Sequence, residues 1–149
     1  MIIKTLVIFT LALLLAVGCK DNDKVVELNL AMFSPSKLDN YGNMIFVENT
    51  NCKSTPILLE KGTYELTLNG YSLPQEPIKG ENAHIIIKAN NIEIANFNLS
   101  NDTLKSYNKF NVTYYKDQNV FFEIIYDNDV FDNGLDRNAF IQKIKLAKN

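Results

Sequence analysis

The chain of 149 residues has little of what many catalytic and metal-binding sites use: one histidine, two cysteines and no tryptophan. His84 lies in the apolar segment Ala83–Ile87, where we expect it on a strand face. One histidine and a lone thiol cannot form a zinc site of the Cys/His type. They also leave no convincing Ser/His/Asp or Cys/His catalytic set, so we expect no enzyme activity.

A hydrophobic run long enough to cross a membrane is also missing. The longest run, Leu6–Val17, is interrupted only by Thr10, whereas a spanning helix needs about 20 apolar residues. Lys4 before the run and Gly18-Cys19 after it are typical of a cleaved secretory signal. The alternative is a signal that ends in Gly-Cys by chance.

The end of this segment, Ala16–Cys19, resembles the lipobox of bacterial lipoproteins, in which the cysteine is acylated and becomes the first mature residue. We therefore expect residues 1–18 to be a signal peptide and residues 19–24 a tether lipidated at Cys19. This places the protein in the bacterial cell envelope, lipid-anchored to the outer membrane, on its periplasmic or outer side. Cys52 is then unpaired, and we expect a small half-buried residue in preference to a reactive thiol.

No excess of charge of one sign is present, with 15 basic and 17 acidic residues. The absence of a basic stripe argues against a nucleic-acid partner and against attachment to anionic lipid by charge alone. Residues 25–149 have the length of one domain and can bury a core without disulfides or metals.

From Val25 onward, short segments rich in Val, Ile, Phe, Tyr and Thr alternate with Asn, Gly, Asp and Pro. Apolar residues alternate with polar ones in 64–69 and 120–127, which is typical of strands. Asn90-Asn91 predicts a hairpin turn, because asparagine tolerates positive φ. The pattern predicts a single all-β domain, a β-sandwich of jelly-roll type. The expected strands are Val25–Phe33, Met44–Glu48, Ile57–Leu59, Thr63–Tyr71, Ala83–Ala89, Ile92–Leu99, Tyr107–Tyr115, Val120–Tyr126 and Asn138–Leu146.

The densest polar segment is Tyr126–Asn138, which holds four aspartates within ten residues. Four carboxylates repel one another, so a bound cation would favour a folded loop. Oxygen donors without imidazole or thiolate point to Ca²⁺ in preference to a transition metal. The spacing is not that of an EF-hand, since Asp132 and Asn138 stand where that motif has glycine and glutamate. A solvated Asp/Asn turn between two strands is the alternative.

Three motifs extend this observation. Gly62–Tyr64 opens a strand with Gly-Thr-Tyr, and Ala95–Phe97 is a small residue, a variable one and an aromatic. Tyr126–Asp129 is aromatic-x-Asn-Asp, followed after six residues by Asp136–Asn138, which is Asp-Arg-Asn. Together the motifs resemble those of the calcium-dependent xylan-binding modules, carbohydrate-binding module families thirty-six and sixty, over residues 62–146.

The resemblance implies a β-sandwich in which loop carboxylates hold Ca²⁺ and the ion binds vicinal sugar hydroxyls. By position, the implied metal ligands are Asn128, Asp129 and Asp136, and the implied sugar-binding residues are Arg137, Asn138 and Tyr71. Arg137 either contacts sugar oxygens or braces the loop by pairing with a carboxylate, which suits its planar guanidinium. Tyr71 is a candidate because no tryptophan is available for stacking on a sugar.

We expect a non-catalytic, lipid-anchored protein that binds a xylan-like or glucan-like polysaccharide or oligosaccharide through this ion. Two positions depart from the family pattern, Gln142 in place of an aspartate and Ala139 in place of a larger aliphatic residue. The alternative is therefore an envelope interaction protein with a purely structural calcium ion and a protein partner. Glycoside hydrolysis by paired carboxylates is a third possibility, which we disfavour because the clustered acids all lie in one short loop.

Overall fold

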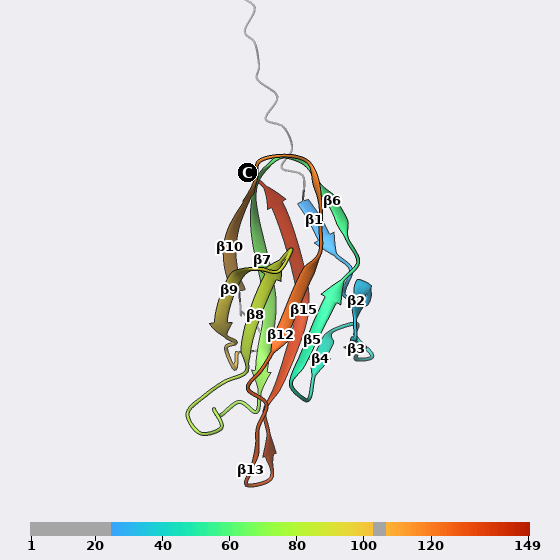
Figure 1. Ribbon diagram of the computed structural model, residues 1–149. Helices are drawn as coiled ribbons and strands as arrows, with labels where there is room; N and C mark the ends of the chain where they lie inside the picture. Colours follow the sequence, from blue (N-terminus) through green and yellow to red (C-terminus); the bar gives the residue numbers. More distant parts are fainter. Residues whose placement is uncertain (1–24, 103–106) are drawn as a thin grey trace, which may run out of the picture.

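The computed structural model describes residues 25–102 and 107–149 (Figure 1). The expected signal peptide, the lipidation site Cys19 and the tether 19–24 lie outside these residues. Within the described residues, no helix has the length and apolar character that crossing a membrane requires.

Two antiparallel sheets pack face to face, which confirms the expected single-domain β-sandwich. The first, sheet A, contains in spatial order β10 (Tyr107–Tyr114), β7 (Gly62–Leu73), β15 (Asn138–Lys148), β4 (Met44–Phe46) and β3 (Lys37–Leu38), with β1 (Val25–Leu28) also paired to β15. The second, sheet B, contains β2 (Phe33–Ser34), β5 (Thr50–Ser54), β12 (Phe122–Tyr126), β8 (His84–Ala89) and β9 (Ile92–Asn98). The short pairs are β6 (Ile57–Leu59) with β11 (Gln118–Val120) and β13 (Phe131–Asp132) with β14 (Leu135–Asp136).

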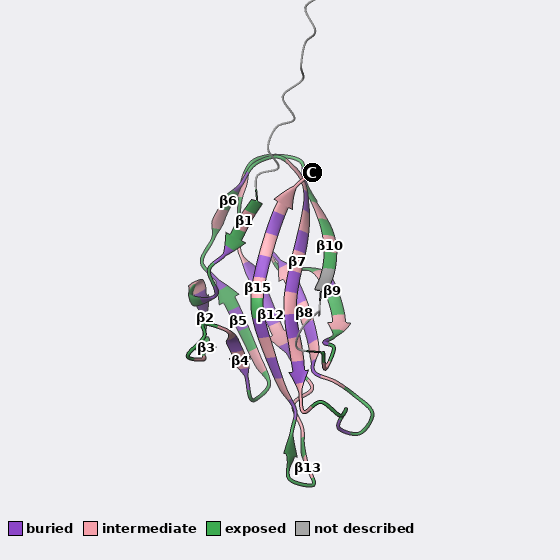
Figure 2. Cartoon of the chain, turned by 180° about the vertical axis from the view of Figure 1, so that it is seen from behind, coloured by how far each residue is buried: buried purple, intermediate pink, exposed green. Residues whose placement is uncertain are grey.

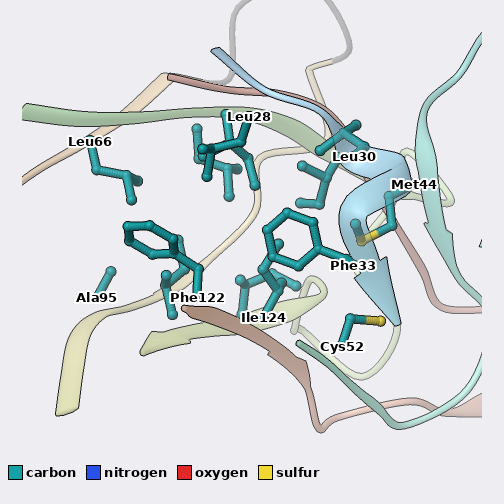
Figure 3. Close-up of a cluster of buried hydrophobic side chains, with 14 of the residues drawn as sticks. Leu28, Leu30, Phe33, Met44, Cys52, Leu66, Ala95, Phe122 and Ile124 are labelled. Carbon is teal, nitrogen blue, oxygen red and sulfur yellow. The ribbon is translucent and has the colours of Figure 1, made fainter. Parts of the chain in front are cut away.

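The core lies between the two sheets and follows the period-two pattern of the sequence. Leu66 and Leu68 of β7 and Ile124 of β12 are fully buried, while Thr67 between the leucines is only partly buried. Figure 3 shows side chains from both sheets meeting in this layer, among them Leu66 from sheet A and Phe122 from sheet B. Each such side chain contributes about 1.5–3 kcal/mol when it leaves water, so the alternation is sufficient to hold the sheets together.

Cys52 belongs to this core, with 1% of its surface exposed. Its thiol donates to the main-chain oxygen of Pro35, and burial raises its pKa to about 11. A buried, protonated thiol is unreactive, as expected from the sequence, but the side chain is fully buried and not half-buried.

Two expected strands need correction, and one observed strand was not expected. The segment Val25–Phe33 is broken by a short 3-10 helix, Leu30–Met32, because the Asn29 side chain accepts the main-chain N–H of Ala31. Val120–Tyr126 is divided at Phe121, where the chain leaves its pairing with β6 and joins β5 and β8. Strand β5 was not expected, because most of its residues are polar.

The two-residue turn at Asn90-Asn91 is confirmed. Both residues have positive φ, 49° and 69°, and they join β8 to β9 where Ala89 pairs with Ile92. The Asn90 side chain also accepts the main-chain N–H of Phe121 at 3.1 Å. The turn is thereby attached to the point where β11 ends and β12 begins.

A second local feature lies where β7 pairs with β15. A Cβ at Gly70 would lie 2.6 Å from the main-chain oxygen of Phe140, so only glycine allows this close approach. The register between the strands shifts at Ile141/Lys143, which makes Gln142 the extra residue of a β-bulge.

The first described residues and the segment 126–138 lie at opposite ends of the sandwich. Val25 pairs with Ala147 near the end of β15, whereas the segment 126–138 lies at the start of that strand. At a rise of about 3.3 Å per residue, the two regions are about 30 Å apart. Figure 1 shows the start of β1 and the C-terminus at one end of the sandwich and the β13 hairpin at the other.

Candidate functional site

The candidate site is the end of the sandwich formed by three segments: the turn 47–49, the loop 74–83 and the segment 127–137. The last of these contains the β13–β14 hairpin, in which Asn133 and Gly134 adopt positive φ to close the turn. The hairpin projects from the end of the molecule (Figure 1), and Phe131 is 71% exposed. The expected polar loop is thus a defined hairpin preceded by a short connection.

Arg137, the only arginine of the chain, joins these segments and is 3% exposed. Its Nη2 donates to the main-chain oxygen of Ile78 at 2.6 Å, and its Nη1 donates to that of Asn128 at 2.5 Å. Glu81 lies 3.7 Å from Nη1. This geometry corresponds to the bracing role, in which Arg137 supports the loop, but through main-chain carbonyl groups more than through a carboxylate. In this conformation the guanidinium is not accessible to a sugar.

Tyr126 connects the core to the same segment. Its hydroxyl donates to the main-chain oxygen of Arg137 at 2.6 Å and lies 3.3 Å from a carboxylate oxygen of Asp129. Burial, followed by the charge of Asp129, raises the pKa of Tyr126 well above its ordinary value. The hydroxyl therefore stays protonated and serves as a fixed donor beneath the loop.

Asp129 and Asp136 form the acidic part of the site. Burial raises the pKa of Asp129, the hydrogen bond from Tyr126 lowers it, and the nearby charge of Asp136 raises it again. The net effect is a pKa above the ordinary value. Such a shift means that the negative charge at Asp129 is disfavoured, and a bound cation would relieve this.

Asn128 has a different role from the one implied by the family resemblance. Its side-chain oxygen accepts the main-chain N–H of His84 at 2.7 Å, and its amide donates to the main-chain oxygen of Asn82 at 2.9 Å. The side chain fastens the loop to the start of β8. These contacts do not support a metal-ligand role for Asn128.

The fit of the remaining residues to a calcium ion can be examined directly. No three side chains of His, Cys, Asp or Glu gather as a metal-binding group anywhere in residues 25–102 and 107–149. The side-chain oxygen of Asn138, however, is buried without a hydrogen-bond partner. Because Ca²⁺ takes 6–8 oxygens, including amide and water oxygens, an ion at this end would draw its ligands from Asp129, Asp136, Asn138 and water.

Tyr71 lies on the outer face of sheet A, close to this end. Its ring stacks on that of Phe140, with ring centroids 4.8 Å apart and an interplanar angle of 1°. Asn138 lies on the same face, two residues before Phe140 on β15. The structure therefore brings two of the expected sugar-binding residues, Tyr71 and Asn138, onto one surface.

His84 is on a strand face, as expected, but it is not isolated. Its Nδ1 lies 2.6 Å from Asp127, and its Nε2 lies 2.7 Å from the side-chain oxygen of Asn96. Burial lowers its pKa, but the bonds to Asp127 and Asn96 and the charges of Asp127 and Glu93 outweigh this effect and raise the pKa. Asp127 is thus engaged by β8, the neighbour of β12 in sheet B.

Several residues of the site were not identified from the sequence. Asn49 accepts the main-chain N–H of Asp129 at 2.7 Å, although the two residues are 80 positions apart in the sequence. The main-chain oxygen of Ile78 accepts from the Arg137 guanidinium, which is 59 positions away. Nothing local in the sequence marks such contacts. Phe140 could have been found, because the alternation within its strand places it on the outer face.

No family model and no curated protein matches the chain. Several solved structures share its fold, among them the following three. The CBM36-1 domain of a multidomain xylanase from the hindgut metagenome of Trinervitermes trinervoides is 16% identical, with a TM-score of 0.53, and the match covers 86% of this chain and 98% of that domain. The others are a family two carbohydrate esterase from Cellvibrio japonicus (10% identity, TM-score 0.51, 86% of this chain) and the Cry4Aa toxin from Bacillus thuringiensis (18%, 0.50, 83%).

The matches cover very different shares of the three solved chains. This chain corresponds to 34% of the esterase and 22% of the toxin, but to nearly the whole xylanase domain. At these identities the likeness concerns the fold alone. The protein is an all-β sandwich similar to a carbohydrate-binding module.

Proposed function

We propose that this protein is a non-catalytic carbohydrate-binding protein, anchored by lipid at Cys19 in the bacterial cell envelope. Its ligand is a xylan-like or glucan-like polysaccharide, bound through a Ca²⁺ ion in the segment 126–138. The fold likeness to a CBM36 domain over nearly its whole length supports this proposal. So do the Asn-Asp and Asp-Arg-Asn motifs at the end of the sandwich.

The observation that carries the proposal is the support of the backbone around Asp129 and Asp136, where Tyr126 donates to the main-chain oxygen of Arg137. The charge of Asp136 contributes to the raised pKa of Asp129, and Arg137 and Tyr126 fix the backbone around both residues. A calcium ion held by these carboxylates and by Asn138 would keep exchangeable waters. Two neighbouring sugar hydroxyls can replace such waters, because neutral oxygens are ordinary calcium ligands.

The position of the site also suits a tethered binding protein. The tether would enter at Val25, about 30 Å from the loop end by strand length. Attachment at one end and binding at the other would direct the loops away from the membrane. A long polysaccharide could then be held without steric interference from the lipid surface.

A second candidate function is an envelope interaction protein with a structural calcium ion. It is favoured by the engagement of Arg137 and Asn128 in bonds within the protein. In that case the ion would stiffen the hairpin, and the exposed side chain of Phe131 would be available to a protein partner.

A glycan array probed with and without Ca²⁺ separates the two functions. The protein should bind neutral glycans on the array with calcium and lose them in chelator, and Asp136→Ala should bind none. Asp132→Ala is the matched control, since it removes an aspartate of the same hairpin that lies 4.0 Å from Lys79. Absence of binding to every neutral glycan in calcium would leave the interaction protein as the better account.

A further inference from the structure

The outer face of sheet A carries a depression lined by lysines, separate from the loop end. The lining residues are Lys109 from β10, Thr67 and Asn69 from β7, and Lys143 and Lys145 from β15. Thr67 pairs with Lys109 on one side and with Lys145 on the other, so the three residues lie side by side on adjacent strands. Lys143 pairs with Asn69 in the next row of outward-facing residues along the sheet. Figure 2 views β7, β10 and β15 from the side opposite to Figure 1 and shows the alternation of buried and partly exposed residues along β7 and β15.

The depression is positively charged in a chain whose net charge is −2. Lys109 lies 3.0 Å from Glu65 and Lys143 lies 3.4 Å from Glu27. Lys145 makes no ion pair within the described ranges 25–102 and 107–149, although Glu27 lies opposite it in the register of β1 and β15. The side chains of Lys109 and Lys143 are 63% and 40% exposed, and such pairs are weak, so an incoming anion can replace Glu65 or Glu27.

The groups in and beside the depression suit a sugar acid better than a simple inorganic anion. The Thr67 hydroxyl and the Asn69 amide add neutral hydrogen-bonding groups between the lysines. The stacked rings of Tyr71 and Phe140 lie further along the same face. Tyr71 follows Asn69 by two residues on β7, which makes it the next residue of that strand on this face. A chain of sugars bearing carboxylates presents charge, hydroxyls and apolar C–H surface, and these three features match the three kinds of group on this face.

We propose that this depression is a binding site for an acidic saccharide chain, recognised through its uronate carboxylates. The site goes beyond the proposed calcium-dependent function, because it uses neither Asp129 nor Asp136. Thr67 lies six residues from the end of β7 at Leu73, which places the depression about 20 Å from the loop end. Both sites could be occupied by one protein at once.

The test is a calorimetric titration of an oligogalacturonate into the full chain in EDTA, so that calcium cannot contribute. Wild-type protein should bind, and binding should weaken as salt is raised, because the charges are exposed. Lys145→Gln and Lys109→Gln should each weaken binding by about two- to fivefold, as expected for one exposed ion pair. Lys116→Gln, an exposed lysine outside the depression, is the charge-matched control and should leave binding unchanged.

Three results would overturn the proposal: no binding of wild-type protein in EDTA, equal binding of a polyglutamate of the same charge, or equal weakening by Lys116→Gln. Unchanged melting temperatures of the lysine variants would establish that their effect is local. Asp136→Ala should bind the oligogalacturonate like wild type. Failure of the calcium site and failure of this site are therefore distinguishable.

Discussion

The guanidinium Nη2 of Arg137 lies 2.6 Å from the main-chain oxygen of Ile78, a residue 59 positions away in the sequence. One side chain thereby joins the loop before β8 to the segment before β15. Because Arg137 is almost fully buried, its bonds to main-chain oxygens hold the site in place before any ligand arrives.

Arg137→Gln should destabilise the protein, because the oxygen of Asn128 loses its donor and that of Ile78 keeps only the main-chain N–H of Glu81. A hydrogen bond to a charged group contributes about 1.5–3 kcal/mol, so the loss of both bonds should cost about 3–6 kcal/mol in urea unfolding. Lys79→Gln, which removes an exposed cation of the same loop end, should change stability little. Equal stability of Arg137→Gln and wild type would show that the bonds contribute nothing.

Calcium should raise the melting temperature of the wild-type protein, since an ion that binds only the folded state stabilises it. The gain is about 2.7 kcal/mol at a hundredfold excess over Kd. Asp129→Ala and Asp136→Ala should each abolish this rise, while Asp132→Ala should retain it. A wild-type melting curve that ignores both calcium and chelator would favour a solvated turn.

The stability contributed by His84 should depend on pH. Its pKa is raised in the folded protein, so its contribution is complete below the unfolded pKa of about 6.5 and is lost as pH rises through the folded value. The difference in unfolding free energy between wild type and His84→Gln should therefore shrink from pH 6 toward pH 9. A difference that stays constant over this range would contradict the bond to Asp127 as its source.

The fold could be predicted further than the site. Alternation in residues 64–69 was sufficient to place Leu66 and Leu68 in the core, because a strand exposes every second residue to one face. Strand β5 escaped notice because its five residues include Thr50, Asn51, Lys53 and Ser54. Its pairing between β2 and β12 defines it as a strand, and this pairing is not visible in local composition.

For the site, the sequence identified the correct segment but not every role within it. Asn128 and Asp129 are adjacent, yet the Asn128 side chain bonds to the start of β8, whereas the Asp129 carboxylate accepts from the Tyr126 hydroxyl. These directions depend on contacts across 44 and more positions, which only the packing of the two sheets determines. Motif spacing alone could not distinguish a ligand from a structural amide.

Lipidation gives a prediction at the other end of the chain. Cys19→Ala should release the protein from the membrane or leave the precursor uncut, because the acylated thiol is the proposed anchor. One diacylglycerol with an additional acyl chain gives stable attachment, whereas single chains bind only weakly. Detergent partitioning of the variant measures this. A variant that is processed and still partitions into detergent like wild type would contradict the proposed anchor.

The central claim is that a calcium ion at Asp129 and Asp136 carries the sugar. Its most direct test is a calorimetric titration of a xylo-oligosaccharide into calcium-loaded protein, repeated in EDTA and with Asp136→Ala. We expect single-site binding of about −4 to −6 kcal/mol, corresponding to high-micromolar to millimolar Kd, present in calcium and absent in the other two titrations. Tight calcium binding without heat from any neutral oligosaccharide, or sugar binding that persists in EDTA, would contradict it.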